Sequence, residues 1–445
     1  MPNVVILLAD QWRAQALGYA GDPNVKTPNL DRLSRESINF THAVSGCPVC
    51  SPARAGLLTG QHPLTHGVFV NDVCLSNKAT SLAQAYKGAG YDTAYIGKWH
   101  LDGHGRTAYI PPERRQGFDY WKVLECTHDY NHSPYYEGDS EQRLCWEGYD
   151  AFAQTRDAQH YIRTHDHRSP FLLVLSWGPP HNPYETAPRE YGATYAPENI
   201  TLRPNVPPHM AQAARRDLAG YYAHCSALDA CVGDVSQTLQ DAGIADDTIL
   251  VFMSDHGDML GSQGRQRKQV PWDESIRVPF LLRAPFLKGQ EGKRVDVLLD
   301  MPDIMPTLLG LCGIHVPDTV EGLDFSGHLR GGPAPSAGSA LMTCPHPFGE
   351  FHCGIGGREY RGVCTGRYTY VRSHAGPWLL YDNKEDEYQQ KNLTNIPEYA
   401  ELQAELDDRL QRKLAVRGDE FLRGEEYVQR WGYPIDETGT VPYTE

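Results

Sequence analysis

Long apolar runs are missing from this chain of 445 residues. The longest early one, Val4–Ala9, has the length of a β-strand, whereas a transmembrane helix needs about 20 consecutive apolar residues. Internal repeats and low-complexity tracts are missing as well, which argues against solenoids and disordered tracts. The composition therefore predicts a globular protein that does not use a membrane as its partner.

Positive charge is also scarce. The chain has 41 Lys and Arg residues against 56 Asp and Glu residues, a formal net charge of −15. A general nucleic-acid binder needs a clustered positive surface, so nucleic acid is not expected as a partner. A local basic pocket for a small anion is still compatible with this balance.

The cysteines do not suggest a disulfide framework. There are eleven, scattered and odd in number, which fits free thiols in a reducing compartment. No basic segment with a cleavage site opens the sequence, which as written predicts a cytoplasmic protein. A periplasmic or secreted protein whose leader had been removed would look the same. Oligomeric state is not indicated.

Short β-rich runs alternate with helical patterns. The runs are Val4–Ala9, Thr93–Ile96, Phe171–Ser176, Ile249–Met253 and Phe280–Leu282. The helical patterns between them include Asn29–Glu36, Ser81–Ala89 and Leu218–Leu239. This alternation predicts an α/β fold with a mostly parallel central sheet flanked by helices.

A second, smaller domain is expected at the C-terminal end. The Gly- and Pro-rich stretch Gly331–Ser336 predicts a linker. Beyond it, Gly362–Arg372 and Trp378–Tyr381 are typical of antiparallel strands, and Glu398–Val416 of an amphipathic helix. We expect an α/β domain over residues 1–335 and an α+β domain with an antiparallel sheet over residues 336–445.

Polar residues follow four of the predicted strands. In chain order they are Asp10 and Gln11, Lys98 and His100, His181, and Asp255 and His256. The carboxyl ends of parallel strands meet at one edge of a sheet, where ligands bind in such folds. Any one of these residues alone would more often be an ordinary surface or cap residue, but together they predict one site.

The segment Ser45–Arg54 (SGCPVCSPAR) contains two cysteines. Ser51 suits a helix N-cap, Pro52 the first helical position, and the helix would stop at Gly60. Residue 50 would then lie at a helix N-terminus, where free N–H groups and the helix dipole favour an anion.

The two cysteines are therefore not equivalent. Arg54, one turn along the helix, can point back at Cys50, whereas Cys47 lies outside this anion site. A thiolate nucleophile would also suit the position, but the spacing differs from the Cys-x5-Arg loop of cysteine phosphatases.

The stretch Cys50–Arg54 (CSPAR) resembles the Cys-x-Pro-x-Arg signature of the sulfatase family, with Ala53 where the family usually carries Ser. Further matches follow in the family's order: Gly97–Leu101 (GKWHL), Pro180 and His181, Ser254–Gly257 (SDHG), Lys268, and Gly376–Asp382 (GPWLLYD). The chain resembles a type I sulfatase over its whole length. The resemblance implies an alkaline-phosphatase-like fold and hydrolysis of an organic sulfate monoester.

The resemblance also implies a divalent metal held by Asp10, Gln11, Asp255 and His256, with residue 50 as a further ligand. Oxygen-rich sites favour Ca²⁺. The family usually has Asp-Asp where Asp10-Gln11 stands and often Asn in place of His256, so Mn²⁺ is the alternative.

The nucleophile implied by the resemblance is formylglycine (3-oxoalanine), made from Cys50 by a formylglycine-generating maturation enzyme. One hydroxyl of the hydrated aldehyde would attack sulfur, and loss of a proton from the other would release sulfate. The resemblance also implies roles for the basic residues. Arg54 and Lys98 would hold the hydrate and neutralise sulfate, and Lys268 would bind a sulfate oxygen near the leaving group. His100 would accept the second hydroxyl's proton, and His181 would bind sulfate and protonate the leaving oxygen.

Substrate-binding residues are less clearly marked. The segments Cys126–Tyr136 and His346–Arg361 are rich in histidine, aromatic and charged residues, which suits a sugar or a small polar group but equally suits solvated loops. The candidates are His104, His128, His132 and Arg358.

Three functions are compatible with these motifs. A sulfated carbohydrate is the expected substrate because Gly257–Arg283 resembles that branch of the family, with choline sulfate or an aryl sulfate as alternatives. A phosphonate monoester or phosphodiester hydrolase shares the aldehyde and the Asp-Gln and Asp-His pairs. A redox pair or zinc half-site at Cys47 and Cys50 is the third, although zinc would need a second cysteine pair, which the sequence does not offer.

Overall fold

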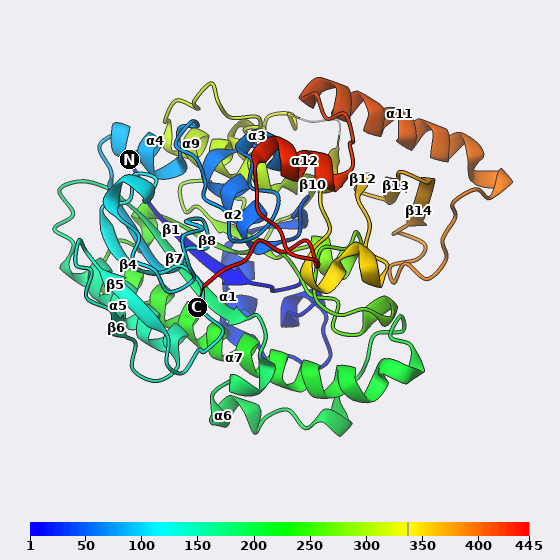
Figure 1. The fold of residues 1–445 in the computed structure, drawn as a ribbon. Coiled ribbons are helices and arrows are strands. Elements are labelled where there is room, and N and C mark those ends of the chain that lie inside the picture. The colour runs from blue at the N-terminus through cyan, green and yellow to red at the C-terminus, as the bar shows by residue number, and fades with distance from the viewer. Residues whose placement is uncertain (336–337, 445) are drawn as a thin grey trace.

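The computed structural model describes residues 1–335 and 338–444, and a large mixed sheet runs through its centre (Figure 1). Within the described residues this sheet has ten strands. In spatial order they are β10 (Arg294–Asp300), β2 (Ile38–Val44), β9 (Phe280–Arg283), β8 (Thr248–Ser254), β1 (Asn3–Asp10), β7 (Phe171–Pro180), β3 (Asp92–Lys98), β4 (Tyr120–Leu124), β5 (Pro134–Glu137) and β6 (Leu144–Cys145).

The centre of the sheet is parallel, as the sequence predicted. Strand β1 runs parallel to both β7 and β8, and β3 runs parallel to β7 and β4. Strand β9 is antiparallel to β8 and β2, and β5 and β6 extend the opposite edge as antiparallel strands. The carboxyl ends of β1, β3, β7 and β8 therefore lie at one edge.

Helices cover both faces of this sheet. Alternate residues of β1 explain why: Val4 and Ile6 pack into one hydrophobic core, and Val5 and Leu7 into another on the opposite face. Helices α2, α4 and α9 lie over the first core, and α1, α5 and α7 over the second. No helix in the described ranges is long and apolar enough to cross a membrane.

The helix bounds are α1 (Pro28–Glu36), α2 (Cys50–Thr59), α3 (Pro63–His66), α4 (Leu82–Gly88), α5 (Asp150–Thr164), α6 (Arg189–Gly192), α7 (Ala211–Asp241), α8 (Asp273–Ile276), α9 (Ile304–Cys312), α10 (Ser326–Leu329), α11 (Ala400–Arg417) and α12 (Gly424–Trp431).

The predicted antiparallel sheet of the C-terminal region is present. Its strands are β11 (Ser339–Cys344), β12 (Tyr360–Thr365), β13 (Tyr368–Ser373) and β14 (Gly376–Asp382). Helix α11 packs one side of it through leucines such as Leu406 and Leu410. Ser336, the last residue of the predicted linker, lies outside the described residues, and the domain boundary after residue 335 stays a prediction.

The chain beyond α11 returns to the large sheet. Tyr427, Val428 and Val441 are buried in the core that also contains α2, α4 and α9. The ring of Phe69 contacts Tyr427 and Tyr433 at centroid distances of 6.2 and 5.4 Å. Figure 1 shows this last part of the chain crossing beside α2 and α3.

The start of α2 differs from the predicted cap. The helix begins at Cys50, with Val49 as the N-cap residue, so Ser51 is not the cap. The Ser51 hydroxyl is buried without a hydrogen-bond partner among the described residues. Its backbone N–H instead donates to Asn71 Oδ1 at 3.1 Å, so a side chain from another segment satisfies this free donor. The predicted stop at Gly60 is confirmed by its left-handed backbone, φ 65°.

Candidate active site

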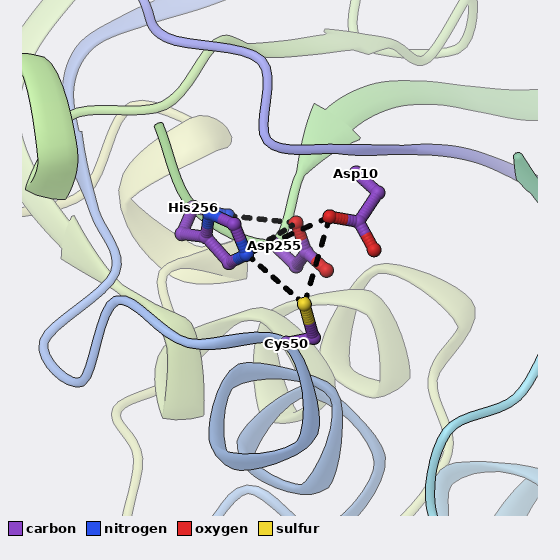
Figure 2. Close-up of side chains that lie close together, drawn as sticks. All are labelled: Asp10, Cys50, Asp255 and His256. Atoms are coloured by element: carbon purple, nitrogen blue, oxygen red, sulfur yellow. Dashed lines mark hydrogen bonds and ion pairs between the residues drawn. The ribbon is translucent and has the colours of Figure 1, made fainter. Parts of the chain in front are cut away.

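The predicted strand-end residues meet at the carboxyl edge of the sheet. Asp10 and Lys98 are the last residues of β1 and β3, and His181 and Asp255 directly follow β7 and β8. Figure 2 shows Cys50 on the first turn of α2, with its sulfur facing the carboxylates. All five side chains are buried, and the four strand-end residues lie at the edge of the sheet where the sequence predicted them.

Four side chains form a compact group of possible metal ligands. Candidate ligand atoms of Asp10, Cys50, Asp255 and His256 all lie within 4.8 Å of one another. Asp10 Oδ1 is 3.6 Å from both the Cys50 sulfur and His256 Nε2 (Figure 2). His256 Nδ1 is 2.9 Å from the carbonyl oxygen of Gly257, which favours a proton on Nδ1 and turns Nε2 toward Asp10 and Cys50.

The two carboxylates are oriented by basic side chains. Asp10 Oδ2 accepts from Lys98 Nζ at 2.6 Å and from Arg54 Nη2 at 3.1 Å, and Arg54 Nε donates to Asp255 Oδ2 at 3.1 Å. The Oδ1 atoms of Asp10 and Asp255 lie 3.6 and 3.8 Å from His256 Nε2, and Asp255 Oδ1 also accepts from the backbone N–H groups of Gln11 and His256 at 3.0 and 2.9 Å.

The pKa values of the two carboxyl groups are shifted in opposite directions. Burial raises the pKa of Asp255, and the neighbouring Asp10 carboxylate raises it further. Burial and the nearby thiol would also raise the pKa of Asp10, but Lys98 and Arg54 hold it below its usual value. Two buried carboxylates this close favour a cation between them, so the donor set fits a divalent metal.

The environment of residue 50 favours a negatively charged side chain. Lys268 Nζ lies 3.1 Å and Lys98 Nζ 3.9 Å from the Cys50 sulfur. Burial alone would raise the pKa of the thiol, but the charges of Lys268, Lys98 and His256 bring it well below the usual value. An ionised oxygen at this position would be stabilised in the same way.

Lys268 links residue 50 to two other predicted residues. Its Nζ donates to His181 Nε2 at 2.8 Å and to Gln11 Oε1 at 3.1 Å. His181 Nδ1 lies 2.8 Å from the Asn182 carbonyl oxygen. Burial and the charge of Lys268 lower the pKa of His181. His181 is therefore neutral in this arrangement and accepts a hydrogen bond from Lys268.

Gln11 lies at the margin of the ligand group. Its backbone is left-handed, φ 70°, and its Nε2 donates to Asp258 Oδ2 at 2.6 Å. Tyr184 donates to the same carboxylate. Neither Asp258 nor Tyr184 was predicted as part of the site. The role of Gln11 as a metal ligand stays a prediction.

His100 is held by two residues, Asp72 and Arg106, that were not predicted as part of the site. Its Nε2 is 3.3 Å from Asp72 Oδ1, and Arg106 binds Asp72 through Nε and Nη2 at 3.0 and 2.9 Å. His100 Nδ1 is buried without a hydrogen-bond partner among the described residues. The His100 imidazole is one of the groups that lower the pKa of the Cys50 thiol.

The four substrate candidates lie in different surroundings. His128 stacks on His181 with ring centroids 4.8 Å apart, so it lies beside the site. His104 pairs with Asp102, and His132 is exposed and pairs with Asp129. Arg358 lies over the ring of Trp378. The structure shows only His128 in contact with a predicted catalytic residue.

The structure also separates the two cysteines of the SGCPVCSPAR segment. Both are free thiols. Burial raises the pKa of Cys47 to about 12, and its neighbours include Arg361 and Thr343 of the C-terminal sheet. Cys50 instead faces His256 and Lys268. A shared redox or zinc role for the two is not supported by this arrangement.

Comparison with known proteins gives the family. The model of the sulfatase family matches residues 2–314, and the model described as N-sulphoglucosamine sulphohydrolase, C-terminal, matches residues 261–415. The ulvan-active sulfatase of Formosa agariphila is 47% identical over 100% of this chain and 87% of its own length. The endo-4-O-sulfatase of Bacteroides thetaiotaomicron is 31% identical over 88% of each chain.

A solved structure agrees with these matches. A Bacteroides fragilis protein assigned as a sulfatase superposes with a TM-score of 0.86 at 30% identity, covering 96% of this chain and 97% of its own. The chain therefore belongs to the sulfatase family. It is an enzyme that hydrolyses sulfate esters, as the motifs predicted.

Proposed function

We propose that this sulfatase removes sulfate from a sulfated carbohydrate. The observation that carries the proposal is the buried cationic setting of residue 50, with Lys268 and Lys98 within 3.1 and 3.9 Å of its sulfur. A sulfate group brought to this position would meet both ammonium groups. The carbohydrate part is supported by the 47% identical relative, which is named for its action on ulvan.

We propose further that Cys50 is converted to formylglycine by a maturation enzyme. The sulfur atom marks where the oxygens of that side chain would lie, next to Lys268 and the possible metal ligands. Once hydrated, the aldehyde supplies a hydroxyl nucleophile for sulfur and a second hydroxyl whose ionisation releases sulfate. Unmodified cysteine has no second hydroxyl, so the thiol itself would not turn over.

The resident metal is proposed to be Ca²⁺, with Mn²⁺ as the alternative. Asp10, Asp255 and His256 would hold it together with an oxygen of the converted residue 50. Two carboxylates favour Ca²⁺, and the imidazole Nε2 makes Mn²⁺ acceptable. When bound, the cation supplies positive charge that favours ionisation of the nucleophile.

The chain's own residues supply the remaining steps. Arg54 and Lys98 hold Asp10 in place, which fixes the ligand group. Lys268 donates toward both residue 50 and His181, so it is well placed to neutralise charge that develops on the leaving oxygen. His100, oriented by Asp72, is proposed to accept a proton from residue 50 through Nδ1, which has no hydrogen-bond partner among the described residues.

Removal of divalent metal tests the metal part of the proposal. Activity on a sulfate ester should be lost on dialysis against a chelator, because the charge that favours ionisation of residue 50 is removed. Ca²⁺ should restore it more fully than Mn²⁺ at equal concentration. Activity that survives complete removal, confirmed by elemental analysis of the protein, would contradict a metal role.

The first experiment is peptide mass spectrometry across residue 50 on protein produced beside a formylglycine-generating enzyme. An aldehyde at this residue is the expected result. A thiol that persists in fully active protein, or a bond between Cys50 and Cys47, would overturn the formylglycine proposal.

A phosphonate monoester or phosphodiester hydrolase is the second candidate, favoured by the Gln11 and His256 side chains that lie in the site. The two functions are separated by kcat/KM for a sulfate monoester and for a phosphate diester on one preparation. We expect the sulfate ester to be preferred, and a dominant diesterase would reverse the choice.

A further inference from the structure

Arg265 and Arg358 have aromatic partners and, within the described part of the chain, no acidic ones. The guanidinium carbon of Arg265 is 5.2 Å from the ring centre of Trp272, and that of Arg358 is 4.5 Å from the ring centre of Trp378. The two tryptophan rings meet edge to face at a centroid distance of 5.6 Å. These four side chains form one continuous unit, here called the Arg–Trp cluster.

The positive charge of the cluster is uncompensated. Among the described residues, neither guanidinium forms an ion pair, whereas Arg267 pairs with Glu350 at 3.3 Å. Burial lowers the pKa of Arg265, and so does the charge of Arg358. Holding two like charges together without a counter-ion is unfavourable, and a bound anion would remove that cost. The chain as a whole is strongly acidic, so the missing acid partner is a local feature.

The cluster lies close to the proposed reaction centre. Arg265 is three residues from Lys268, a separation of at most about 11 Å along the chain. The segment that carries Arg358 is fastened to the same loop, because Phe348 N–H donates to Gln269 Oε1 at 3.3 Å and the Tyr360 hydroxyl donates to the Gln269 carbonyl at 3.1 Å. Both segments that carry the cluster arginines are therefore joined to the loop that carries Lys268.

We propose that the Arg–Trp cluster binds a second anionic group, a carboxylate or a sulfate, on a sugar next to the one that loses its sulfate. For the substrate class this rests on the proposed function. A guanidinium presents a planar fork of donors that matches both anions. The faces of Trp272 and Trp378 position the two guanidinium groups and offer apolar surface for a sugar ring. The preferred substrate is therefore an acidic oligosaccharide or polysaccharide.

Binding tests the cluster independently of hydrolysis. All chains carry Cys50→Ala, so nothing is turned over. The probes are three tetrasaccharides, one with uronate carboxylates, one neutral but disulfated, and one neutral and unsulfated, titrated by ligand-observed NMR. Arg265→Ala and Arg358→Ala should each weaken binding of an acidic probe about tenfold or more. Arg367→Ala is the matched control, because Arg367 also lies over a ring, Tyr368, but pairs with Asp382.

The probes also identify the anion. Loss confined to the uronate probe assigns a carboxylate, and loss confined to the disulfated probe assigns a sulfate. If the parent chain binds neither acidic probe better than the neutral one, or if both variants bind as it does, the cluster proposal is overturned.

The second test measures the kinetics of Arg265→Ala and Arg358→Ala in the enzyme that keeps Cys50. The ratio of kcat/KM for an acidic sulfated oligosaccharide to that for 4-nitrophenyl sulfate should fall about tenfold in either variant. An equal fall on both substrates indicates a structural role and overturns the proposal. If the parent enzyme hydrolyses no carbohydrate sulfate but the cluster still binds acidic sugar, the proposed function fails and the anion site stands.

Discussion

The two cysteines of the SGCPVCSPAR segment are three residues apart, yet their surroundings differ. Cys50 faces Lys268 and His256 at 3.1 and 3.2 Å, whereas Cys47 lies near Thr343 and Arg361. A short motif cannot predict these surroundings, because the side chains around each cysteine come from distant parts of the chain.

Substitution of each cysteine by serine tests this difference. Cys50→Ser should reduce kcat on a sulfate ester by at least about 10³-fold, because the nucleophile is lost. Cys47→Ser should retain most of the activity, because Cys47 does not face the site. Thermal unfolding of both variants controls for misfolding. Equal loss of activity in two well-folded variants would contradict the sulfatase mechanism proposed for Cys50.

Asp72 is proposed to position His100 without contacting substrate. Asp72→Asn keeps the size of the side chain but removes the charge that holds Arg106 and orients the imidazole. We expect kcat to fall about 10–100-fold while KM changes little, because proton transfer and not binding is affected. The control is Asp382→Asn, which breaks an ion pair with Arg367 in the C-terminal sheet. A change confined to KM would argue against this role.

Elements were predicted best where their signal is local and strong. The run Val4–Ala9 became β1, and the helical pattern Ser81–Ala89 became α4. Strands β2 and β10 were not predicted, because apolar and polar residues are mixed along both strands and only some of their side chains are buried. The antiparallel direction of β9 depends on its neighbours in space, which its own four residues do not encode.

The first residue of α5 makes stability depend on pH. Asp150 Oδ1 is buried without a hydrogen-bond partner among the described residues, and burial raises the pKa of this carboxyl to about 8. Between about pH 4 and pH 8 the folded state keeps a proton that the unfolded state has released. Stability from this group is therefore present at low pH and is lost as the pH rises toward 8.

The test compares the thermal unfolding midpoint of the wild type and Asp150→Asn at pH 5, 6.5 and 8. The asparagine stays neutral, so the variant should gain stability relative to the wild type as the pH rises. Asp157→Asn on the same helix is the control, because Asp157 pairs with Lys122 at 2.9 Å. Parallel pH curves for the wild type and Asp150→Asn would contradict the argument.

The whole molecule depends on the return of its C-terminal segment. Tyr427, Val428 and Val441 complete a core that α2, α4 and α9 share, and the Tyr433 hydroxyl donates to the Gly67 carbonyl at 2.9 Å. The ring centre of Tyr443 lies 3.3 Å from the guanidinium carbon of Arg106, and Arg106 in turn binds Asp72. Tyr443 therefore lies on the His100 side of the site.

Residues 1–335 expressed alone should not give a cooperatively folded protein. Three large buried side chains from beyond residue 420 would be missing, each worth about 1.5–3 kcal/mol of burial, which is a large share of a typical stability. Circular dichroism during thermal unfolding tests this, with the full chain as the control. A sharp transition in the shorter chain would show that the predicted domain is independent.

The sequence by itself determined the family, the parallel sheet and the acids, lysine and histidines at its carboxyl edge. It could do so because strand periodicity is local and parallel strands bring their ends together by geometry. Only the tertiary structure decided the rest: the support of His100 by Asp72 and Arg106, the Arg–Trp cluster, and the packing of the C-terminal segment. These contacts join parts of the chain up to 366 residues apart, and their pairing depends on loop paths and core packing that no local pattern encodes.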